Sequence, residues 1–212
     1  MFSSILKVAE ASLPTTRGDF RILGFQGTLA PGTMPGPQGK LVEEAVVLQY
    51  GSHADLAAKP PIVRIHSQCL TGDVFHSLRC DCRQQLDLAL DTVVAHGSGL
   101  IVYEEQEGRG IGLMAKLRAY ELQDQGFDTI EANLKLGYRS DHRDFSLPAE
   151  VLKVMGISAV RLITNNPEKV SALESAGIQV VERLSAEVES HETSEKYLEI
   201  KREKMGHLIG SL

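Results

Sequence analysis

The stretch AVRLITNNPEKVSALESAGIQVVE, residues 159–182, decides the fold class of this chain. It opens with a strand rich in branched apolar side chains, residues 159–164. Asn166-Pro167 then provides a helix start, and Gly177 provides the stop. A second strand follows directly, at residues 178–182. Strand, helix and strand in this order predict a parallel pair with a right-handed crossover, the unit of α/β folds.

Two more strand–helix units precede this stretch. Short apolar runs at residues 61–66 and 99–103 are typical of buried strands. Helical spacing follows each run, and Gly97 can end the first of these helices. A further helix is expected from Pro148, suited to a first helical position, to a stop at Gly156. The apolar positions at helical spacing are Leu86, Leu90, Val93 and Val94 in the first helix and Leu113, Leu117 and Tyr120 in the second.

The first part of the chain predicts antiparallel β-structure instead. Strand-like runs at residues 20–25 and 45–50 follow a turn-like segment at residues 15–19. Between the two runs, residues 27–39 contain four glycines and three prolines, which is typical of a mobile loop. This loop, about residues 27–42, is a surface insertion or an active-site lid. We therefore predict an α/β fold with mixed sheets, an antiparallel β-rich N-terminal part and a βαβ-containing C-terminal part.

Composition and charge exclude several classes of protein. The net charge is -6 and no long run of Lys and Arg occurs, so we expect no nucleic-acid partner. No segment approaches the ~20 apolar residues needed to cross a bilayer. Lys7 and Glu10 interrupt the N-terminus, so it lacks the apolar stretch of a secretory signal. The odd number of cysteines, three, argues against a disulfide framework and fits a cytoplasmic protein.

The stretch from Thr193 to Met205 predicts a surface helix.

The cysteines form a C-x10-C-x-C cluster of Cys69, Cys80 and Cys82 among polar neighbours. Buried apolar cysteines are the simpler interpretation. However, a structural zinc site normally has four closed ligands, whereas three protein ligands and one open position are typical of a catalytic zinc. His66 or His76 could close the site instead. Cys82 immediately precedes a predicted helix, whose positive end favours thiolates.

A glycine-rich turn, residues 106–112, lies between a predicted strand and a predicted helix. Backbone N–H groups can approach an anion there, and Arg109 can pair with a phosphate. Glu107 offers a carboxylate that can accept hydrogen bonds from N1 and the exocyclic amino group of a guanine. Taken alone, a plain strand-to-helix turn is the simpler interpretation.

Two further segments carry candidate groups. The loop at residues 164–169 follows the C-terminal end of a strand, where ligands collect in parallel sheets, and its Lys169 suits a phosphate. Asp141 and Arg143 lie in a polar loop and suit a general base and an electrostatic clamp. A solvated lysine and a surface ion pair are the simpler alternatives.

Taken together, these segments resemble GTP cyclohydrolase II, the first committed enzyme of riboflavin synthesis. The matching segments are Arg64–Asp73, Ser77–Cys82, Gln106–Leu113, Lys116–Tyr120, Asp141–Phe145 and Thr164–Lys169, with further likeness at Ala9–Thr15 and Lys204–His207. The resemblance covers nearly the whole chain apart from the Gly/Pro-rich loop. We expect a single catalytic domain over residues 1–212, without the dihydroxybutanone-phosphate synthase domain often fused in this family.

The resemblance implies a chemistry and a set of partners. GTP would be hydrolysed with opening of the guanine imidazole ring, releasing formate and pyrophosphate and leaving 2,5-diamino-6-ribosylamino-4(3H)-pyrimidinone 5′-phosphate. One catalytic Zn²⁺ per chain would be held by the three cysteines, Mg²⁺ would accompany the triphosphate, and the chain would form a homodimer. The residues implied to line the GTP pocket are Arg64, Ile65, His66, Ser67, Gln68, Gln85, Glu107, Gly108, Arg109, Thr129, Thr164 and Lys169.

The resemblance also assigns catalytic roles. Asp141 would be the general base and Tyr120 would position the substrate. Arg143 is usually described in this family as a nucleophile that takes the nucleotidyl group. A guanidinium with a pKa above ~12 is a poor nucleophile, so stabilising charge at the α-phosphate is the easier role.

Two positions depart from the family pattern. Gln68 stands where the family typically has Glu, and Glu105 stands where a basic residue is common. The alternatives are therefore a paralogue that stops at the formylated ring-opened intermediate or acts on another nucleotide, and a non-catalytic zinc-stabilised nucleotide-binding module.

Overall fold

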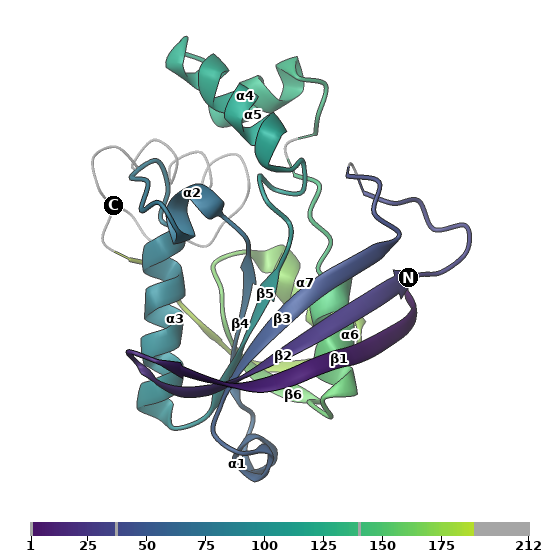
Figure 1. Ribbon diagram of the computed structural model, residues 1–212, viewed down its shortest axis with the longest axis vertical. Coiled ribbons are helices and arrows are strands. Elements are labelled where there is room, and N and C mark those ends of the chain that lie inside the picture. Colours follow the sequence, from purple (N-terminus) through teal and green to yellow (C-terminus); the bar gives the residue numbers. More distant parts are fainter. Residues whose placement is uncertain (1, 37, 140, 189–212) are drawn as a thin grey trace.

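The computed structural model describes residues 2–36, 38–139 and 141–188, which build one seven-stranded sheet of order β1-β2-β3-β5-β4-β6-β7 (Figure 1). The strands are β1 (Phe2–Thr15), β2 (Gly18–Leu29), β3 (Val42–Tyr50), β4 (Ile62–Ser67), β5 (Gly99–Glu104), β6 (Ala159–Ile163) and β7 (Gln179–Leu184). The helices are α1 (His53–Ala58), α2 (Leu70–Asp73), α3 (Cys82–His96), α4 (Leu113–Asp124), α5 (Thr129–Lys135), α6 (Ser146–Val154) and α7 (Pro167–Ser175). The predicted α/β class is confirmed, and the two predicted parts share a single mixed sheet.

The N-terminal part is antiparallel, as predicted. β1, β2 and β3 form a meander, and β3 pairs antiparallel with β5. The Thr15 hydroxyl oxygen accepts a hydrogen bond from the backbone N–H of Gly18 at 3.2 Å and so closes the first turn. The predicted strands at residues 20–25 and 45–50 lie within β2 and β3.

Two details of this part differ from the sequence-based expectation. β1 was not expected, because its residues are mostly exposed on the edge of the sheet and show no clear apolar alternation. Residues 27–29, expected in the Gly/Pro-rich loop, continue β2, so the loop runs from Ala30 to Leu41. Pairing with β3 accounts for the extension, since Thr28 lies opposite Val42 in the register.

The C-terminal part is parallel and follows the predicted pattern. β4 pairs in parallel with both β5 and β6, and β6 pairs in parallel with β7. The side chain of Asn166 caps α7 by accepting a hydrogen bond from the Glu168 N–H, and Gly177 follows that helix in the left-handed region. Gly97 likewise ends α3. Pro148 is the third residue of α6 rather than the first, still within the turn whose N–H groups lack intrahelical partners.

Two hydrophobic clusters cover the two faces of the sheet. Alternate residues of β5 divide between them: Leu100 and Val102 belong to the larger cluster, whereas Ile101 belongs to the smaller one. Residues of α6 and α7 complete the larger cluster, and Ala89 and Val93 of α3 complete the smaller one. Burial of both faces explains why the central strands are almost continuously apolar.

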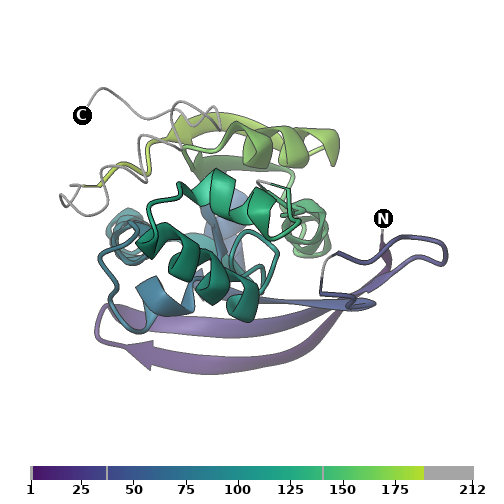
Figure 2. The ribbon, with the colours of Figure 1, turned by 90° about the horizontal axis from the view of Figure 1, so that it is seen from above.

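Helices α4 and α5 stand apart from both faces. They lie beyond the ends of β4 and β5, and seen from above they cover that end of the sheet (Figure 2). The predicted helix from Thr193 to Met205 and the family-like segment at residues 204–207 lie outside the described residues. Within the described ranges, no helix is both long and apolar enough to cross a membrane.

β4, β5 and α3 pack closely around Gly99. A Cβ at Gly99 would lie 2.6 Å from the Ile62 carbonyl oxygen and 2.9 Å from Cγ2 of Val93. We expect Gly99→Ala to lower the free energy of unfolding by about 1–3 kcal/mol, the usual cost of overpacking. Gly36→Ala is the matched control, because a Cβ there meets nothing within 4 Å. Urea unfolding midpoints measure both, and equal midpoints would contradict this account of the packing.

Candidate functional site

The predicted site residues converge at the carboxyl ends of three parallel strands. Cys69 follows β4, the glycine-rich turn follows β5, and the loop at residues 164–166 follows β6. In open α/β sheets this edge is where ligands bind. α2, α4 and α5 lie around the same edge (Figure 1).

The three cysteine sulfurs form a compact group. Their Sγ atoms all lie within 4.8 Å of one another, and those of Cys69 and Cys80 are 3.7 Å apart. Gly72 makes room for them, because a Cβ there would lie 3.0 Å from Sγ of Cys80 and 3.2 Å from Sγ of Cys69. Three sulfurs at these separations can share one metal ion.

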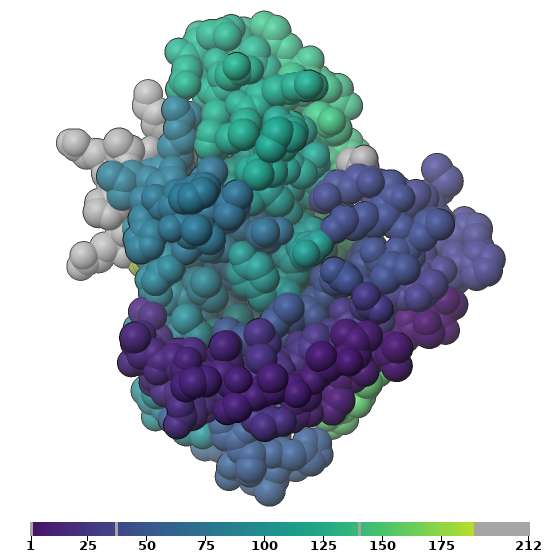
Figure 3. All heavy atoms as spheres, viewed as in Figure 1, coloured from purple at the N-terminus to yellow at the C-terminus, as the bar shows by residue number. Residues whose placement is uncertain are grey.

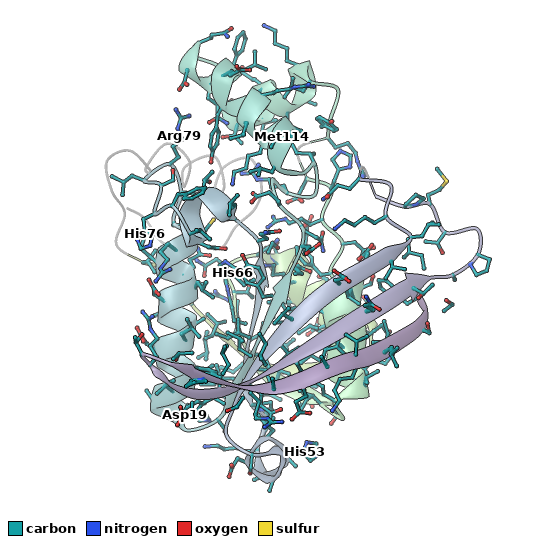
Figure 4. The ribbon with its side chains drawn as sticks, in the orientation of Figure 1. Asp19, His53, His66, His76, Arg79 and Met114 are labelled. Carbon is teal, nitrogen blue, oxygen red and sulfur yellow. The ribbon has the colours of Figure 1, made fainter. Side chains whose placement is uncertain are left out.

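The two histidines considered as further ligands are not part of this group. His66 is buried, with Nε2 directed at the Asp73 carboxylate 3.2 Å away, and burial lowers its pKa. His76 is exposed and lies on the outer side of the loop after α2 (Figure 4). The sulfur group therefore consists of the three predicted cysteines.

The thiols depend on one another electrostatically. Hydrogen bonds from Cys80 and Cys82 lower the pKa of the Cys69 thiol. The contact with Cys69 raises the pKa of Cys80 to about 11 and raises that of Cys82 as well. Lys116 adds a positive charge, since its Nζ lies 3.2 Å from Sγ of Cys69. All three groups can be ionised together only when a cation sits among them, which fits a divalent metal.

Asp73 holds the backbone of the first cysteine in place. Its carboxylate accepts hydrogen bonds from the Cys69 N–H at 3.1 Å and the Tyr103 hydroxyl at 2.8 Å, and it faces Nε2 of His66. Its backbone carbonyl accepts a hydrogen bond from Arg83. Asp73 is 7% exposed, so these partners replace water around the carboxylate.

The glycine-rich turn is joined to the cysteine loop through Glu107. One carboxylate oxygen accepts a hydrogen bond from the Leu70 N–H at 2.6 Å, and the other accepts from Lys116 at 2.8 Å and the Gly108 N–H at 2.9 Å. Arg109 has a positive φ of 61°, and the glycines on either side of it also have positive φ values. This backbone turns tightly toward the cleft, as an anion-binding turn requires.

Asp141 and Arg143 form a largely buried ion pair beside the glycine-rich turn. Nη2 of Arg143 donates to Oδ2 of Asp141 at 2.6 Å, and Nε donates to Oδ1 at 3.0 Å. The Arg143 N–H donates to the same carboxylate at 2.9 Å. Burial disfavours the charged carboxylate, but the charge and hydrogen bonds of Arg143 outweigh burial and hold the pKa of Asp141 below its ordinary value.

A cleft opens over the sulfur group. Arg143 borders this cleft and also a second hollow of about 750 Å³. Asp141 and the loop at residues 30–41 help to line the second hollow. In the space-filling view, the blue-violet loop forms one flank of this face (Figure 3). The predicted residues that line the first cleft are Ser67, Gln68, Cys69, Cys80, Cys82, Glu107, Gly108, Arg109, Tyr120, Thr129 and Arg143.

Besides Asp141, six predicted residues do not line this cleft; five of them are buried and Gln85 is half-buried. Lys169 is 4% exposed, donates from Nζ to the Ile65 carbonyl at 2.8 Å, and has a pKa lowered by burial. Arg64 donates to Gln85 at 2.6 Å and to the Ile163 carbonyl at 3.1 Å, and burial lowers its pKa to about 10. The six residues are Arg64, Ile65, His66, Gln85, Thr164 and Lys169.

Glu105, noted in the sequence as a departure from the family pattern, forms an ion pair. Its carboxylate pairs with Nζ of Lys40 at 2.6 Å, and both side chains are about half exposed. Lys40 comes from the Gly/Pro-rich loop, so this ion pair joins that loop to the segment that follows β5. Gln68 lines the cleft, and its backbone N–H donates to the Glu104 carbonyl at 2.9 Å.

The sequence-based list of site residues omitted Asp73, Lys116 and Thr71. The Thr71 hydroxyl lies 3.2 Å from the Tyr120 hydroxyl and 3.7 Å from Sγ of Cys69. All three lie within segments that carry the family likeness, which was the available signal. What the sequence did not reveal was the direction of each side chain.

Comparisons with known proteins agree on one family. The model of the GTP cyclohydrolase II family matches residues 6–185. The GTP cyclohydrolase-2 of Escherichia coli K12 is 49% identical over 204 residues, which is 96% of this chain and 97% of that protein. The GTP cyclohydrolase-2 of Citrobacter koseri is also 49% identical, over 205 residues with the same coverage of both chains.

A solved structure shows a much weaker likeness. The two-domain 3,4-dihydroxy-2-butanone 4-phosphate synthase RibBX from A. baumannii gives a TM-score of 0.44 at 13% identity, covering 86% of this chain and 40% of that one. The family model and the curated relatives, by contrast, extend over nearly all of the described residues. The chain belongs to the GTP cyclohydrolase II family of hydrolases.

Proposed function

We propose that this chain catalyses the zinc-dependent hydrolysis of GTP to formate, pyrophosphate and 2,5-diamino-6-ribosylamino-4(3H)-pyrimidinone 5′-phosphate, the first step of riboflavin biosynthesis. The observation that carries the proposal is the group of three cysteine sulfurs within 4.8 Å, which borders the cleft. Three thiolates with a fourth position facing a cleft are the ligand arrangement of a catalytic zinc. Zn²⁺ bound there would lower the pKa of a water to about 7 and supply the nucleophile for C8 of guanine.

The protein groups around the sulfurs would bind and orient the base. Glu107 lines the cleft and already accepts three hydrogen bonds, which leaves lone-pair capacity for a guanine N–H. Ser67, Gln68 and Thr129 line the same cleft. Tyr120, fixed by Thr71, would limit how the base can rotate above the sulfurs.

The phosphates would bind at the glycine-rich turn and Arg143. Arg109 suits bidentate pairing with a phosphate, and Mg²⁺ would neutralise part of the triphosphate charge. Arg143 is held by three side-chain hydrogen bonds to Asp141 and remains a cation, so we assign it to charge stabilisation at the α-phosphate rather than to nucleophilic attack. Asp141 is ionised in this pair and can accept a proton once Arg143 turns toward phosphate.

The buried residues at the base of the cleft would act indirectly. Lys169 and Arg64 donate to backbone carbonyls of neighbouring strands and so would fix the floor on which the substrate rests. A homodimer and a cytoplasmic location complete the proposal, both on the strength of the family resemblance.

An incubation with GTP, Zn²⁺ and Mg²⁺ tests the reaction itself. We expect formate, pyrophosphate and the pyrimidine product to appear in equal amounts, because a single site removes both leaving groups. NMR of ¹H and ³¹P follows all three at once. Pyrophosphate with a retained formyl group would instead identify a paralogue that stops at the ring-opened intermediate, and unchanged GTP would overturn the substrate assignment.

Cys80→Ser tests whether the metal is catalytic. We expect a folded protein that still binds GTP, contains much less zinc and turns over more than about 100-fold more slowly, since even outer partners of a metal cost 10–100-fold. Zinc content, circular dichroism and formate release are measured together. Ser77→Ala, in the same loop, is the control and should retain zinc and activity. Unfolding of Cys80→Ser would show that the metal is structural.

Arg143→Ala tests the electrostatics of the ion pair. In the parent protein the depressed pKa keeps Asp141 ionised until the pH falls below the ordinary value of about 3.9. Without the guanidinium, burial dominates, and we expect the pKa of Asp141 to rise above that value. The pair's contribution to stability, present above about pH 4, would then be lost. Titration by ¹³C NMR of labelled carboxyl groups measures the shift, with Asp141→Asn to assign the signal. A pKa that stays low would contradict the pairing.

A further inference from the structure

Gln106 bridges the glycine-rich turn and the loop at residues 141–145. Its amide N–H donates to the Asp144 carbonyl at 2.5 Å, and its amide oxygen accepts from the Asp144 N–H at 2.8 Å. Both backbone groups of Asp144 are thus paired by one side chain, as they would be by a neighbouring strand. The loop that carries Asp141 and Arg143 is therefore attached to the end of β5.

Glu104 fixes the orientation of this amide. The Gln106 amide N–H donates at 2.9 Å to one oxygen of Glu104, and the Ser67 hydroxyl donates at 2.7 Å to the other oxygen. Glu104 is 1% exposed, so water does not compete for its hydrogen bonds. The Asp144 N–H can only donate and the Asp144 carbonyl can only accept, so the amide oxygen must face the N–H and the amide nitrogen must face the carbonyl and Glu104.

The loop is also closely packed against the turn. The His142 N–H donates to the Arg109 carbonyl at 3.0 Å. A Cβ at Gly110 would lie 3.0 Å from the His142 backbone, so the two segments are in direct contact. Displacement of the loop would move Asp141 and Arg143 relative to the sulfur group.

We propose that Gln106 is a positioning residue, which clamps the backbone of Asp144 and thereby sets the placement of the Asp141–Arg143 pair at the edge of the cleft. The catalytic part of this inference rests on the proposed function. The alternative role for an amide at this place is direct contact with the nucleotide, because Gln106 also lines the cleft. The two roles differ in what a substitution changes. A clamp affects turnover and loop exchange, whereas a substrate contact affects binding.

The experiment compares Gln106→Leu, which keeps the size and loses the hydrogen bonds, with Gln38→Leu as the matched control. Gln38 also faces the glycine-rich turn, but its amide makes a single long contact of 3.5 Å with the Gly110 carbonyl. Hydrogen exchange by mass spectrometry follows the peptide that contains residues 141–145. Zinc content, kcat and KM for GTP are measured on the same preparations.

We expect Gln106→Leu to speed exchange at Asp144 by at least about 10-fold, because an amide released from its hydrogen bond exchanges through local opening. We also expect kcat to fall about 10- to 100-fold while KM stays within about 3-fold and zinc is retained, in line with the cost of misplacing catalytic groups. Gln38→Leu should change none of these. Unchanged exchange at residues 141–145, or a raised KM with normal kcat, would overturn the clamp.

A complementary pair guards against simple misfolding. Gln106→Glu places two carboxylates face to face and should release the loop. Adding Glu104→Gln restores a donor opposite the new carboxylate but not the donor to the Asp144 carbonyl, so exchange at Asp144 should slow only in part. No slowing at all in the double variant would argue against the clamp. If the parent protein leaves GTP unchanged, the proposed function falls, whereas the clamp still stands or falls on the exchange data.

Discussion

Mutual repulsion among three sulfur atoms within 4.8 Å is the constraint on which the site depends. Thiolates that close are stable only where the backbone fixes their carriers and positive charge lies beside them. Asp73 secures the Cys69 N–H, Lys116 brings a cation to the Cys69 sulfur, and Cys82 is the first residue of α3. The positive end of that helix adds to the favourable field. Much of the polar structure around β4 and β5 therefore serves to hold the three sulfur atoms close together.

The parallel strands bring these groups to one place. Because β4, β5 and β6 run in the same direction, their following loops emerge at one edge although they are far apart in sequence. Glu107 then joins two of the loops through the Leu70 N–H, and Gln106 joins the loop that contains Asp144. The antiparallel strands β1 to β3 extend the sheet and supply the loop whose Lys40 reaches Glu105. The parallel strands thus carry most of the candidate site residues, and the antiparallel strands extend the sheet beside them.

Sequence patterns predicted most of the fold and the location of the site. The predicted helix-capping residues Asn166-Pro167, Gly177 and Gly97 matched the observed helix ends, because a capping residue acts on the backbone next to it. β1 was missed because an exposed edge strand carries little apolar pattern. The short helices α1, α2 and α5 were missed because four to seven residues do not establish a period.

Side-chain direction was the other part that the sequence did not contain. The sequence marked Lys169 as suited to a phosphate, and the structure shows that its buried Nζ donates to the Ile65 carbonyl. A motif identifies the loop that approaches a site but not whether a given side chain points into the cleft or away from it. Asp73 shows the converse: a residue that looked like a polar neighbour is buried at the centre of the hydrogen-bond network.

Gly72 has a consequence for how this protein can change over evolutionary time. In the sequence it resembles an ordinary turn glycine, but the space left by its missing side chain is the space that two sulfurs occupy. Any side chain there would displace the sulfurs of Cys69 or Cys80, so we expect position 72 to tolerate only glycine. The exposed pair of Lys40 and Glu105 lies at the opposite extreme, free to drift as long as the two charges change together. We therefore expect mutational tolerance around this cleft to follow the packing of neighbouring atoms.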